Sequence, residues 1–582
     1  MFLSAESLRR PTWQAFERLV VRLLLCEGFE GARLVGQSGD RGADVVAHKD
    51  GKRWLVQVKR WKSRVGIDVV DKTVEALNTY RADVPVIVAL NGFDDAALRH
   101  LPTLHREGYP LQLWDRPRLI ERGARLPPVP PIEAVAGRFD HRMYQEEAIT
   151  TIVNTYLEGH SRKALIVMAT GLGKTFVAAE AYRRIFTGGS ARILVLAHTN
   201  PLVYQLERTF WPFLTPSQET LVWNGDEHPP VADLARASCV FASQQTVYEQ
   251  LQRSGELPHF DIVLIDECHH AGGVMYDTIL GETRAGSDHG PFLLGLTATP
   301  WRADETDIEH YFGAPLITVD LVTGLRNGFL TNVDYRMFMD NINWEGLENL
   351  HGDRFTPGAI NRKLFIHEWD DSVVLQLRRA WEEQPQPRAI IFCGNIDHAV
   401  TMRDKINALG FTRAEAIFSQ SRTGPSMGSF ERNRVLLDFE ERRTNVICVV
   451  DVFNEGIDVP DVNIIVFQRV THSRRIFIQQ LGRGLRLAEG KNKVIVLDFV
   501  SDIRRFAAGL DLKDQLERDP GDRTGPIRVR LPNKVTFQRV GGEDARSESF
   551  LREWLDDVAA IEEAGDDVSV LRFPPTLPGS RL

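Results

Sequence analysis

The segment Met168–Thr175, which reads MATGLGKT, has the residue types and the spacing that bind phosphate groups. It follows the apolar run 164–167, which predicts a buried parallel strand, and it precedes residues 176–186, whose apolar positions have helical spacing. In such a loop, glycines turn the backbone amides inward, a lysine reaches the β and γ phosphates, and a hydroxyl binds Mg²⁺. The residues expected in these roles are Thr170, Gly171, Gly173, Lys174 and Thr175.

A second segment, Asp261–His269, is an apolar strand that ends in two adjacent carboxylates. Asp266 is placed to coordinate the magnesium ion carried by Thr175, and Glu267 is placed to polarise an attacking water molecule. This pair, at this distance after a phosphate-binding loop, indicates ATP hydrolysis with ATP and Mg²⁺ as cofactors.

Near the N-terminus, residues 13–28 predict a helix with apolar residues such as Trp13, Val20 and Leu24 on one face. Glu17 lies among them, so its carboxylate points along an apolar face, where an unpaired charge is costly. Either this carboxylate reaches water from the edge of the face, or it serves a site.

Asp50-Gly51 is a strong hairpin signal between a short strand over residues 45–47 and a second strand over residues 53–59. If these two residues form the whole loop, each cross-strand pair has residue numbers that add to 101. Asp44 then lies directly opposite Gln57, and Lys59 projects from the same face.

A carboxylate, an amide oxygen and an ammonium group that converge in this way suit hydrolysis of a phosphodiester. Asp44 would hold Mg²⁺, the Gln57 carbonyl would add an oxygen ligand, and Lys59 would orient water or stabilise the oxyanion. A solvated polar face is the alternative, and it agrees poorly with Val46 and Leu55 on the same face.

Most of residues 10–125, including the segments GDRGADVV and WLVQVKRW, closely resemble the PD-(D/E)XK nuclease fold in its Mrr-type restriction endonuclease form. The resemblance implies that Asp44, Gln57 and Lys59 are catalytic and that Glu17 is an accessory metal ligand. The basic run 52–64, in which Trp54 and Trp61 are interleaved, suits contacts to backbone phosphates.

The remainder of the chain up to about residue 505 resembles the superfamily 2 helicases. The form ATGLGKT, with Met168 where the general phosphate-loop pattern has glycine, resembles motif I, and DECH resembles the DEAH-type box. LTATP at 296–300 resembles motif III, DVFNEGID at 451–458 motif V, and QQLGRGLR at 479–486 motif VI. The order of these motifs is most like the restriction-subunit branch of the superfamily.

This second resemblance implies further residues at the nucleotide. Gln145, in the segment FDHRMYQ, would read the adenine edge, and Gly456 and Asp458 of motif V would contact the nucleotide from a second lobe. Arg483 and Arg486 lie three residues apart, so one helix face would present both as arginine fingers across the lobes.

The expected fold class is α/β, with an N-terminal PD-(D/E)XK fold, two tandem RecA-like parallel-sheet lobes and a small, mostly helical C-terminal region. Pro127–Pro131 predicts a stiff spacer that would carry the first domain on a semi-rigid tether. The expected divisions are 1–127 for the endonuclease domain, 128–137 for the linker, 138–322 for lobe 1, 323–370 for an inter-lobe connection, 371–508 for lobe 2 and 509–582 for a C-terminal region of unknown role, with one amphipathic helix over 547–564.

Composition agrees with an intracellular enzyme of several domains. The chain has 582 residues, and its net charge of −9 combines a basic N-terminal part with an acidic C-terminal end. The five cysteines include no C-x-x-C pair, no apolar run is long enough to span a membrane, and the N-terminus lacks a signal peptide's apolar core. A cytoplasmic location without a membrane is expected.

The preferred function is an ATP-dependent DNA helicase or translocase joined to a Mg²⁺-dependent endonuclease, in restriction or antiphage defence. A repair helicase-nuclease that acts on broken or branched DNA, a DNA-binding motor without cleavage and an RNA helicase are the alternatives. The expected partner is DNA, in double-stranded form. Because no methyltransferase motif or target-recognition domain is evident, specificity or methyltransferase partner proteins would supply any sequence choice, and the sequence leaves the oligomeric state open.

Overall fold

The structure is a computed structural model, and it divides into two compact units. The first comprises residues 1–168 and 173–318, and the second comprises 169–172 and 319–582. The residues described are 2–9, 12–35, 43–134, 142–187, 191–270, 274–298, 308–338, 354–355, 370–418, 427–450, 461–468, 484–499, 535–540 and 571–572.

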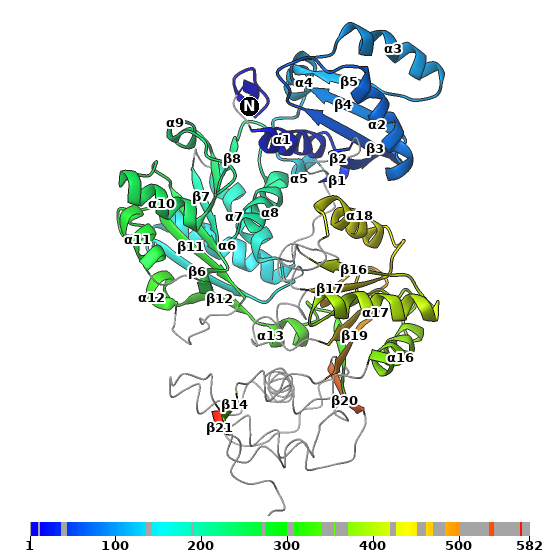
Figure 1. The fold of residues 1–582 in the computed structure, drawn as a ribbon. Helices are drawn as coiled ribbons and strands as arrows, with labels where there is room; N and C mark the ends of the chain where they lie inside the picture. The colour runs from blue at the N-terminus through cyan, green and yellow to red at the C-terminus, as the bar shows by residue number, and fades with distance from the viewer. Residues whose placement is uncertain are drawn as a thin grey trace, which may run out of the picture. The chain divides into compact units, whose positions relative to one another are not determined.

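The N-terminal domain, drawn in blue in Figure 1, is a five-stranded mixed sheet in the order β1-β2-β3-β4-β5. The first three strands pair antiparallel, and β3, β4 and β5 pair parallel. Its strands are β1 (Glu30–Leu34), β2 (Val45–Lys49), β3 (Lys52–Lys59), β4 (Val84–Ala89) and β5 (Gln112–Asp115). Its helices are η1 (Ser7–Arg9), α1 (Trp13–Cys26), α2 (Ile67–Tyr80), α3 (Asp95–Arg106) and α4 (Arg116–Ala124).

Local sequence explains the two elements that matter most in this domain. Thr12 caps α1, because its hydroxyl accepts a hydrogen bond from the Ala15 amide at 3.1 Å. Asp50 and Gly51 have φ angles of 52° and 70°, and positive values at both loop residues match the twist of a tight two-residue hairpin. The predicted hairpin loop is therefore confirmed.

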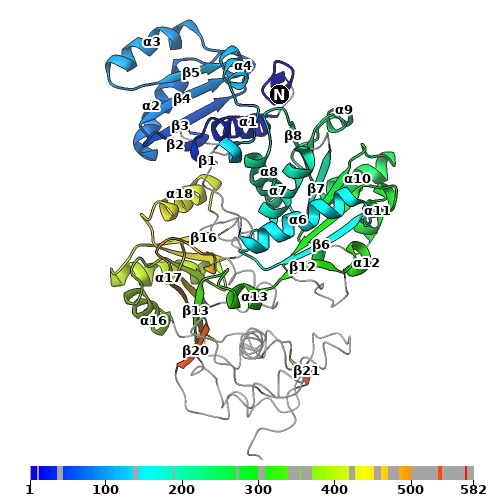
Figure 2. The ribbon, with the colours of Figure 1, turned by 180° about the vertical axis from the view of Figure 1, so that it is seen from behind.

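Lobe 1 is a seven-stranded sheet in the order β12-β6-β11-β10-β7-β9-β8. Its strands are β6 (Lys163–Met168), β7 (Ile193–Ala197), β8 (Thr220–Trp223), β9 (Cys239–Ser243), β10 (Ile262–Asp266), β11 (Phe292–Thr297) and β12 (Pro315–Val319). Its helices are α6 (Met143–Glu158), α7 (Lys174–Thr187), α8 (Asn200–Phe210), η2 (Trp211–Phe213), α9 (Val231–Leu234), α10 (Gln244–Ser254), η3 (Cys268–His270), α11 (Val274–Thr283) and α12 (Glu309–Phe312). Figure 2 shows α6 and α7 over one face of this sheet, with α10 and α11 on the other.

The inner strands of this lobe are buried along their whole length because helices cover both faces of the sheet. In the parallel register Val167 pairs with Thr297, and Asp266 pairs with Leu296. The carboxyl ends of β6, β10 and β11 therefore meet at one edge of the sheet, where ligands bind in such folds.

Lobe 2 is a seven-stranded parallel sheet in the order β16-β17-β15-β18-β19-β13-β20. Its strands are β13 (Asn332–Phe338), β15 (Ala389–Phe392), β16 (Ala414–Phe418), β17 (Val446–Val450), β18 (Ile464–Phe467), β19 (Lys493–Phe499) and β20 (Val535–Val540). Its helices are α13 (Leu321–Arg326), α16 (Asp370–Glu382), α17 (Ile396–Leu409) and α18 (Ser429–Glu440).

Two strands of this sheet come from segments that were not expected to belong to it. β13 lies in the segment 323–370, predicted as an inter-lobe connection, and it pairs along its full length with β19. β20 lies in the C-terminal region and pairs with β13. The described residues of 509–582 form β20 and β21 (Leu571–Arg572), which pairs with β14 (Arg354–Phe355), whereas the helix predicted over 547–564 lies outside the described residues.

Two further properties concern the cysteines and the length of the helices. All five cysteines are free thiols, and four of them are buried. Within the ranges described above, no helix has the length and apolar character needed to cross a membrane.

Candidate functional sites

The β2–β3 hairpin brings Asp44 and Gln57 together. Val45 pairs with Val56 and Lys49 with Lys52, so the predicted register is confirmed. Beyond the last paired residues, the Gln57 side-chain amide donates a hydrogen bond to Asp44 Oδ2 at 2.7 Å.

Two further donors contact the same carboxylate oxygen. The Val58 backbone N–H lies 2.5 Å from Asp44 Oδ2, and Lys59 Nζ lies 3.4 Å from it. The three side chains that the sequence selected therefore form one cluster at the end of β3.

The surroundings of Asp44 suit a bound cation. Burial raises the pKa of this carboxyl group, although the charge of Lys59 and the hydrogen bonds from Val58 and Gln57 oppose that effect. All three of these donors contact Oδ2 rather than Oδ1. A buried carboxylate is an oxygen ligand of the kind that Mg²⁺ takes.

The structure supports the other two predicted metal contacts, Glu17 and Gln57, less fully. Glu17 is 8% exposed on α1, but the described residues contain no group of three His, Cys, Asp or Glu side chains that could hold a metal ion. Gln57 faces Asp44 with its amide nitrogen rather than its carbonyl oxygen. A metal at Asp44 would thus take water or other oxygen ligands, and the Gln57 amide would have to turn before its oxygen could take part.

The basic run around the hairpin divides into an interior part and an exposed part. Arg53 is only 8% exposed, and the Trp54 ring packs edge-on against Phe29 at 5.0 Å, so these two residues belong to the domain interior. Lys62 and Arg64 are exposed and follow shortly after β3. The predicted phosphate-binding surface is therefore smaller than the run suggests.

The phosphate-binding loop lies between β6 and α7. Gly171 and Gly173 have φ angles of 93° and 86°, values that favour glycine and allow the inward turn of the backbone. A Cβ atom at Gly173 would lie 2.8 Å from Gln145 Nε2, so Gln145 lies beside the loop, as a nucleotide contact requires. Its Oε1 accepts the Arg142 backbone N–H at 3.1 Å, which closes the first turn of α6.

Lys174 points at the carboxylates that follow β10. It forms an ion pair with Glu267, and the Lys174 side chain is 11% exposed. Burial alone would lower the pKa of Lys174, but the charges of Glu267 and Asp266 raise it above its ordinary value. The lysine is therefore charged and sits where a phosphate would compete with Glu267 for it.

Asp266 fits the role of a magnesium ligand. Burial raises the pKa of Asp266, the positive charge of Lys174 lowers it, and the negative charge of Glu267 raises it further. Its Oδ1 is buried without a hydrogen-bond partner among the described residues. A divalent cation held between Asp266 and the hydroxyl of Thr175, the second residue of α7, would supply the missing partner.

A contact that was not predicted joins the DECH segment to motif III. His269 Nδ1 lies 2.9 Å from Thr297 Oγ1 and 3.3 Å from Glu267 Oε2, and both His269 and Thr297 are buried. Glu267 itself has a φ angle of 49°, which is strained for a residue with a side chain. The sequence motifs contain His269 and Thr297, but only the pairing of β10 with β11 brings the two side chains into contact.

Ser243 has a structural role at the same edge. Its side chain is buried and caps α10 by accepting a hydrogen bond from the Thr246 amide at 3.2 Å.

Lobe 2 contributes fewer described site residues. Gly456, Asp458 and Arg483 lie outside the described residues. Arg486 was expected on a helix face with Arg483, but it lies at a bend two residues after Gly484, the last helical residue. Thr331 Oγ1 and Lys491 Nζ hold the Arg486 carbonyl oxygen at 2.9 and 3.0 Å, so the backbone of this bend is fixed.

Family models match three successive parts of the chain. The model described as "Restriction endonuclease" matches residues 8–122, "Type III restriction enzyme, res subunit" matches 138–302, and "Helicase conserved C-terminal domain" matches 371–488. The chain thus joins an Mrr-type restriction endonuclease domain to a two-lobed superfamily 2 helicase of the restriction-subunit branch.

Individual relatives match large parts of the chain. The chain is 28% identical over 531 residues to the type I restriction enzyme EcoAI endonuclease subunit of Escherichia coli, which covers 85% of this chain and 62% of the relative. It is 24% identical over 380 residues to the DNA 3'-5' translocase XPB2 of Sulfurisphaera tokodaii, covering 61% of this chain and 81% of that protein. The chain spans about three fifths of the length of the first curated relatives it matches.

Among solved structures, the ATP-dependent Type ISP restriction-modification enzyme LlaBIII bound to DNA is similar in fold. The TM-score is 0.50 at 16% sequence identity, and the alignment covers 95% of this chain and 42% of that one.

Proposed function

We propose that this chain is an ATP-driven DNA helicase or translocase that carries its own metal-dependent DNA endonuclease and acts in restriction or antiphage defence. The observation that carries the proposal is the convergence of Asp44, Gln57 and Lys59 at the end of one hairpin, in a chain that also holds the Lys174–Glu267 pair. The Asp44 cluster has no evident role in ATP hydrolysis, and the Lys174–Glu267 pair has no evident role in DNA cleavage.

In the motor, the described residues would divide the work of ATP hydrolysis. Lys174 would leave Glu267 for the phosphates, and Glu267, once released, would orient the attacking water. Asp266 and Thr175 would hold Mg²⁺, which neutralises charge on the phosphates. His269 contacts both Glu267 and Thr297 of motif III, so a movement of the Glu267 side chain would displace His269 and, through it, Thr297.

In the endonuclease, Asp44 would hold a divalent metal ion through its carboxylate, and Mg²⁺ is the ion we propose. The ion would polarise the scissile phosphate, and Lys59 would stabilise the charge that develops on its oxygens. Gln57 and the Val58 amide hold Asp44 in place.

The substrate we propose is double-stranded DNA. The basic residues after β3 supply charge for backbone phosphates, and the similarity to restriction subunits favours DNA over RNA. Such contacts carry no sequence information, so any target choice would come from a partner protein.

The direct test is to incubate the full chain with supercoiled plasmid, linear duplex and single-stranded DNA, with and without ATP and Mg²⁺. We expect plasmid cleavage that requires Mg²⁺ and is strongly stimulated by ATP, together with ATP turnover stimulated by duplex DNA. Cleavage confined to broken or branched DNA would favour a repair helicase-nuclease. ATP turnover without cleavage in the presence of any divalent metal ion would favour a DNA motor that has no nuclease activity.

Substitution of Gln57 tests its role in the metal site. Gln57→Glu should preserve or strengthen Mg²⁺-dependent cleavage, because the carboxylate adds a charged oxygen ligand, whereas Gln57→Ala should weaken metal affinity by about 10–100-fold. The measurement is the Mg²⁺ concentration at half-maximal cleavage rate. Loss of cleavage in both variants at saturating Mg²⁺ would mean that the amide is needed to hold Asp44 rather than to reach the metal.

The exposed part of the basic run makes a separate prediction. If Lys62 and Arg64 each contact a phosphate, replacing both with alanine should reduce the slope of log affinity against log salt by about two. Fluorescence anisotropy of a labelled duplex across a salt series measures this slope. Arg99→Ala with Arg106→Ala, on α3, is the matched control, and an equal change in both double variants would place the DNA path elsewhere.

A further inference from the structure

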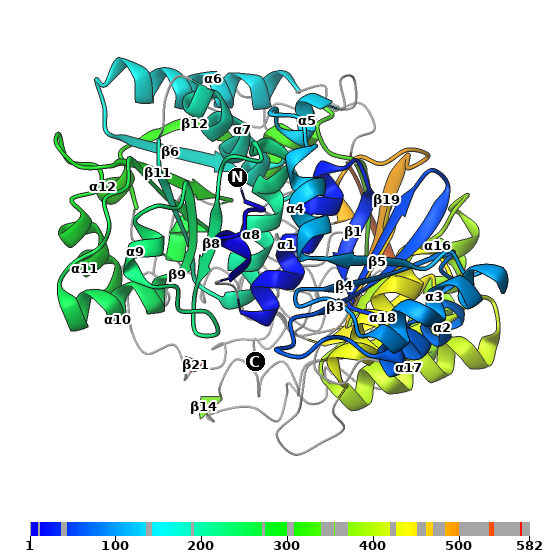
Figure 3. The same cartoon turned by 90° about the horizontal axis from the view of Figure 1, so that it is seen from above.

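Helix α1 lies between the N-terminal sheet and lobe 1. It packs on β1, β2 and β3 of its own domain and on η2 of lobe 1. Figures 1 and 3 show it beside α8. The same helix carries Glu17 and, at the next position, Arg18.

Arg18 is buried in a cluster of two carboxylates from lobe 1. Its Nε donates to Glu207 Oε2 at 2.7 Å, while Nη1 and Nη2 donate to the two oxygens of Glu227 at 2.5 and 3.0 Å. The three side chains are 4–7% exposed. Burial would lower the pKa of Arg18, but the two carboxylates raise it, so this guanidinium stays charged and acts as a fork between α8 and the loop after β8.

Arg22, one turn further along α1, adds a second contact. It is 2% exposed, and its Nη2 donates to the carbonyl oxygens of Thr215 and Gln218 at 3.1 and 2.9 Å. Arg22 thus ties α1 to backbone carbonyl oxygens of lobe 1, whereas Arg18 is the cation that pairs with the two carboxylates.

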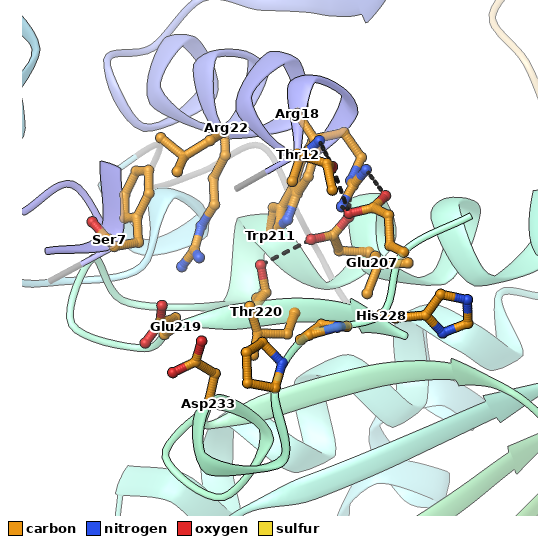
Figure 4. Close-up of a pocket in the computed structure, with 18 residues that line it drawn as sticks. Ser7, Thr12, Arg18, Arg22, Glu207, Trp211, Glu219, Thr220, His228 and Asp233 are labelled. Atoms are coloured by element: carbon orange, nitrogen blue, oxygen red, sulfur yellow. Dashed lines mark hydrogen bonds and ion pairs between the residues drawn. The ribbon is translucent and has the colours of Figure 1, made fainter. Parts of the chain in front are cut away.

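Apolar packing is incomplete at this junction. Figure 4 shows a pocket of about 150 Å³ between α1 and lobe 1, into which Arg18, Arg22 and Glu207 project. Arg18, Glu207 and Glu227 all line this pocket, so the ion cluster forms part of its wall.

The linker does not loosen this junction either. Its residues 131–134 form the short helix α5, and Glu133 pairs with Arg183 on α7 of lobe 1. The semi-rigid tether expected from Pro127–Pro131 is therefore replaced by a docked domain, since the proline run determines local stiffness while Arg18 finds partners about 200 residues away.

The cluster is also linked to the first turns of α8 in lobe 1. Asp226, next to Glu227, accepts hydrogen bonds from Asn200 Nδ2 at 3.1 Å and from the Tyr204 hydroxyl at 3.4 Å. Arg18 lies over the Tyr204 ring, 5.0 Å from its centre. A shift at the start of α8 would therefore reach α1 through two residues.

We propose that the Arg18–Glu207–Glu227 cluster is a joint that fixes the N-terminal domain on lobe 1, and that Arg18 is a positioning residue for DNA cleavage. This inference rests on the proposed function, because it assigns the cluster the task of holding the cutting site at a set place on the motor. Without the Arg18 fork, the endonuclease site and the ATP site each stay intact, but the N-terminal domain moves independently of lobe 1.

The test uses the full chain and the variant Arg18→Met. This change leaves two buried carboxylates without a cation, so the joint should open. We expect ATP turnover within about threefold of wild type, at least about tenfold fewer DNA breaks per ATP hydrolysed, and at least about tenfold faster hydrogen exchange over residues 215–228. Adding Glu207→Gln and Glu227→Gln to Arg18→Met removes the unpaired charge but leaves the fork absent, so the number of DNA breaks per ATP hydrolysed should stay low in the triple variant.

Arg253→Met is the matched control, because Arg253 forms an exposed ion pair with Glu249 on α10 of the same lobe. Wild-type exchange in Arg18→Met would overturn the joint. Faster exchange with an unchanged number of breaks per ATP would overturn the positioning role. If the wild-type chain cut no DNA, the proposed function would fail, whereas the exchange data would still decide whether Arg18 closes the joint.

Discussion

Lys174→Ala should reduce ATP turnover by about 10²-fold or more, because it removes the positive charge that meets the β and γ phosphates. The structure adds a second expectation. Lys174 is the cation beside the buried Asp266 and the partly buried Glu267, and removing one partner of such a group costs about 3–5 kcal/mol. The variant should therefore be both inactive and less stable, with a lower melting temperature.

These two effects can be separated. Adding Glu267→Gln to Lys174→Ala removes one of the unpaired charges, so the double variant should recover most of the lost melting temperature while ATP turnover stays absent. Steady-state ATP hydrolysis with and without duplex DNA, together with thermal unfolding, measures both. DNA-stimulated turnover near wild type in a folded Lys174→Ala chain would contradict the assignment of the phosphate-binding loop.

Asp44→Ala and Lys59→Ala should each reduce Mg²⁺-dependent cleavage by about 10²-fold or more while DNA-stimulated ATP turnover survives. Asp44→Ala removes the buried carboxylate, and Lys59→Ala removes the cation that pairs with it. Neither residue contacts the nucleotide-binding loop, so the motor should keep working. Plasmid cleavage and ATP hydrolysis are measured in the same reactions.

Lys52→Ala is the matched control for this pair, since Lys52 is an exposed lysine on the same strand, at its other end. It should cut at the wild-type rate. If Lys59→Ala and Lys52→Ala cleave equally well, the lysine has no part in the reaction. If Asp44→Ala still cuts, the hairpin cluster is not the endonuclease site.

Sequence by itself determined the elements and the local chemistry of this protein. The apolar runs 164–167 and 262–265 predicted two central strands of lobe 1, because strands covered on both faces must be apolar throughout. The Asp50-Gly51 loop determined the hairpin register, and the register placed Asp44 opposite Gln57. These features depend on neighbours within about fifteen residues, so the local pattern contains them.

Only the tertiary structure decided which distant segments meet. It placed β13 and β20 in the second sheet, brought His269 to Thr297, buried Arg53 within the N-terminal domain, and joined Arg18 to Glu207 and Glu227. It also turned the nitrogen of the Gln57 amide, rather than its oxygen, toward Asp44. Spacing along a chain cannot reveal such contacts, because an arginine on a helix has the same local pattern whether it faces water or a carboxylate 189 residues away.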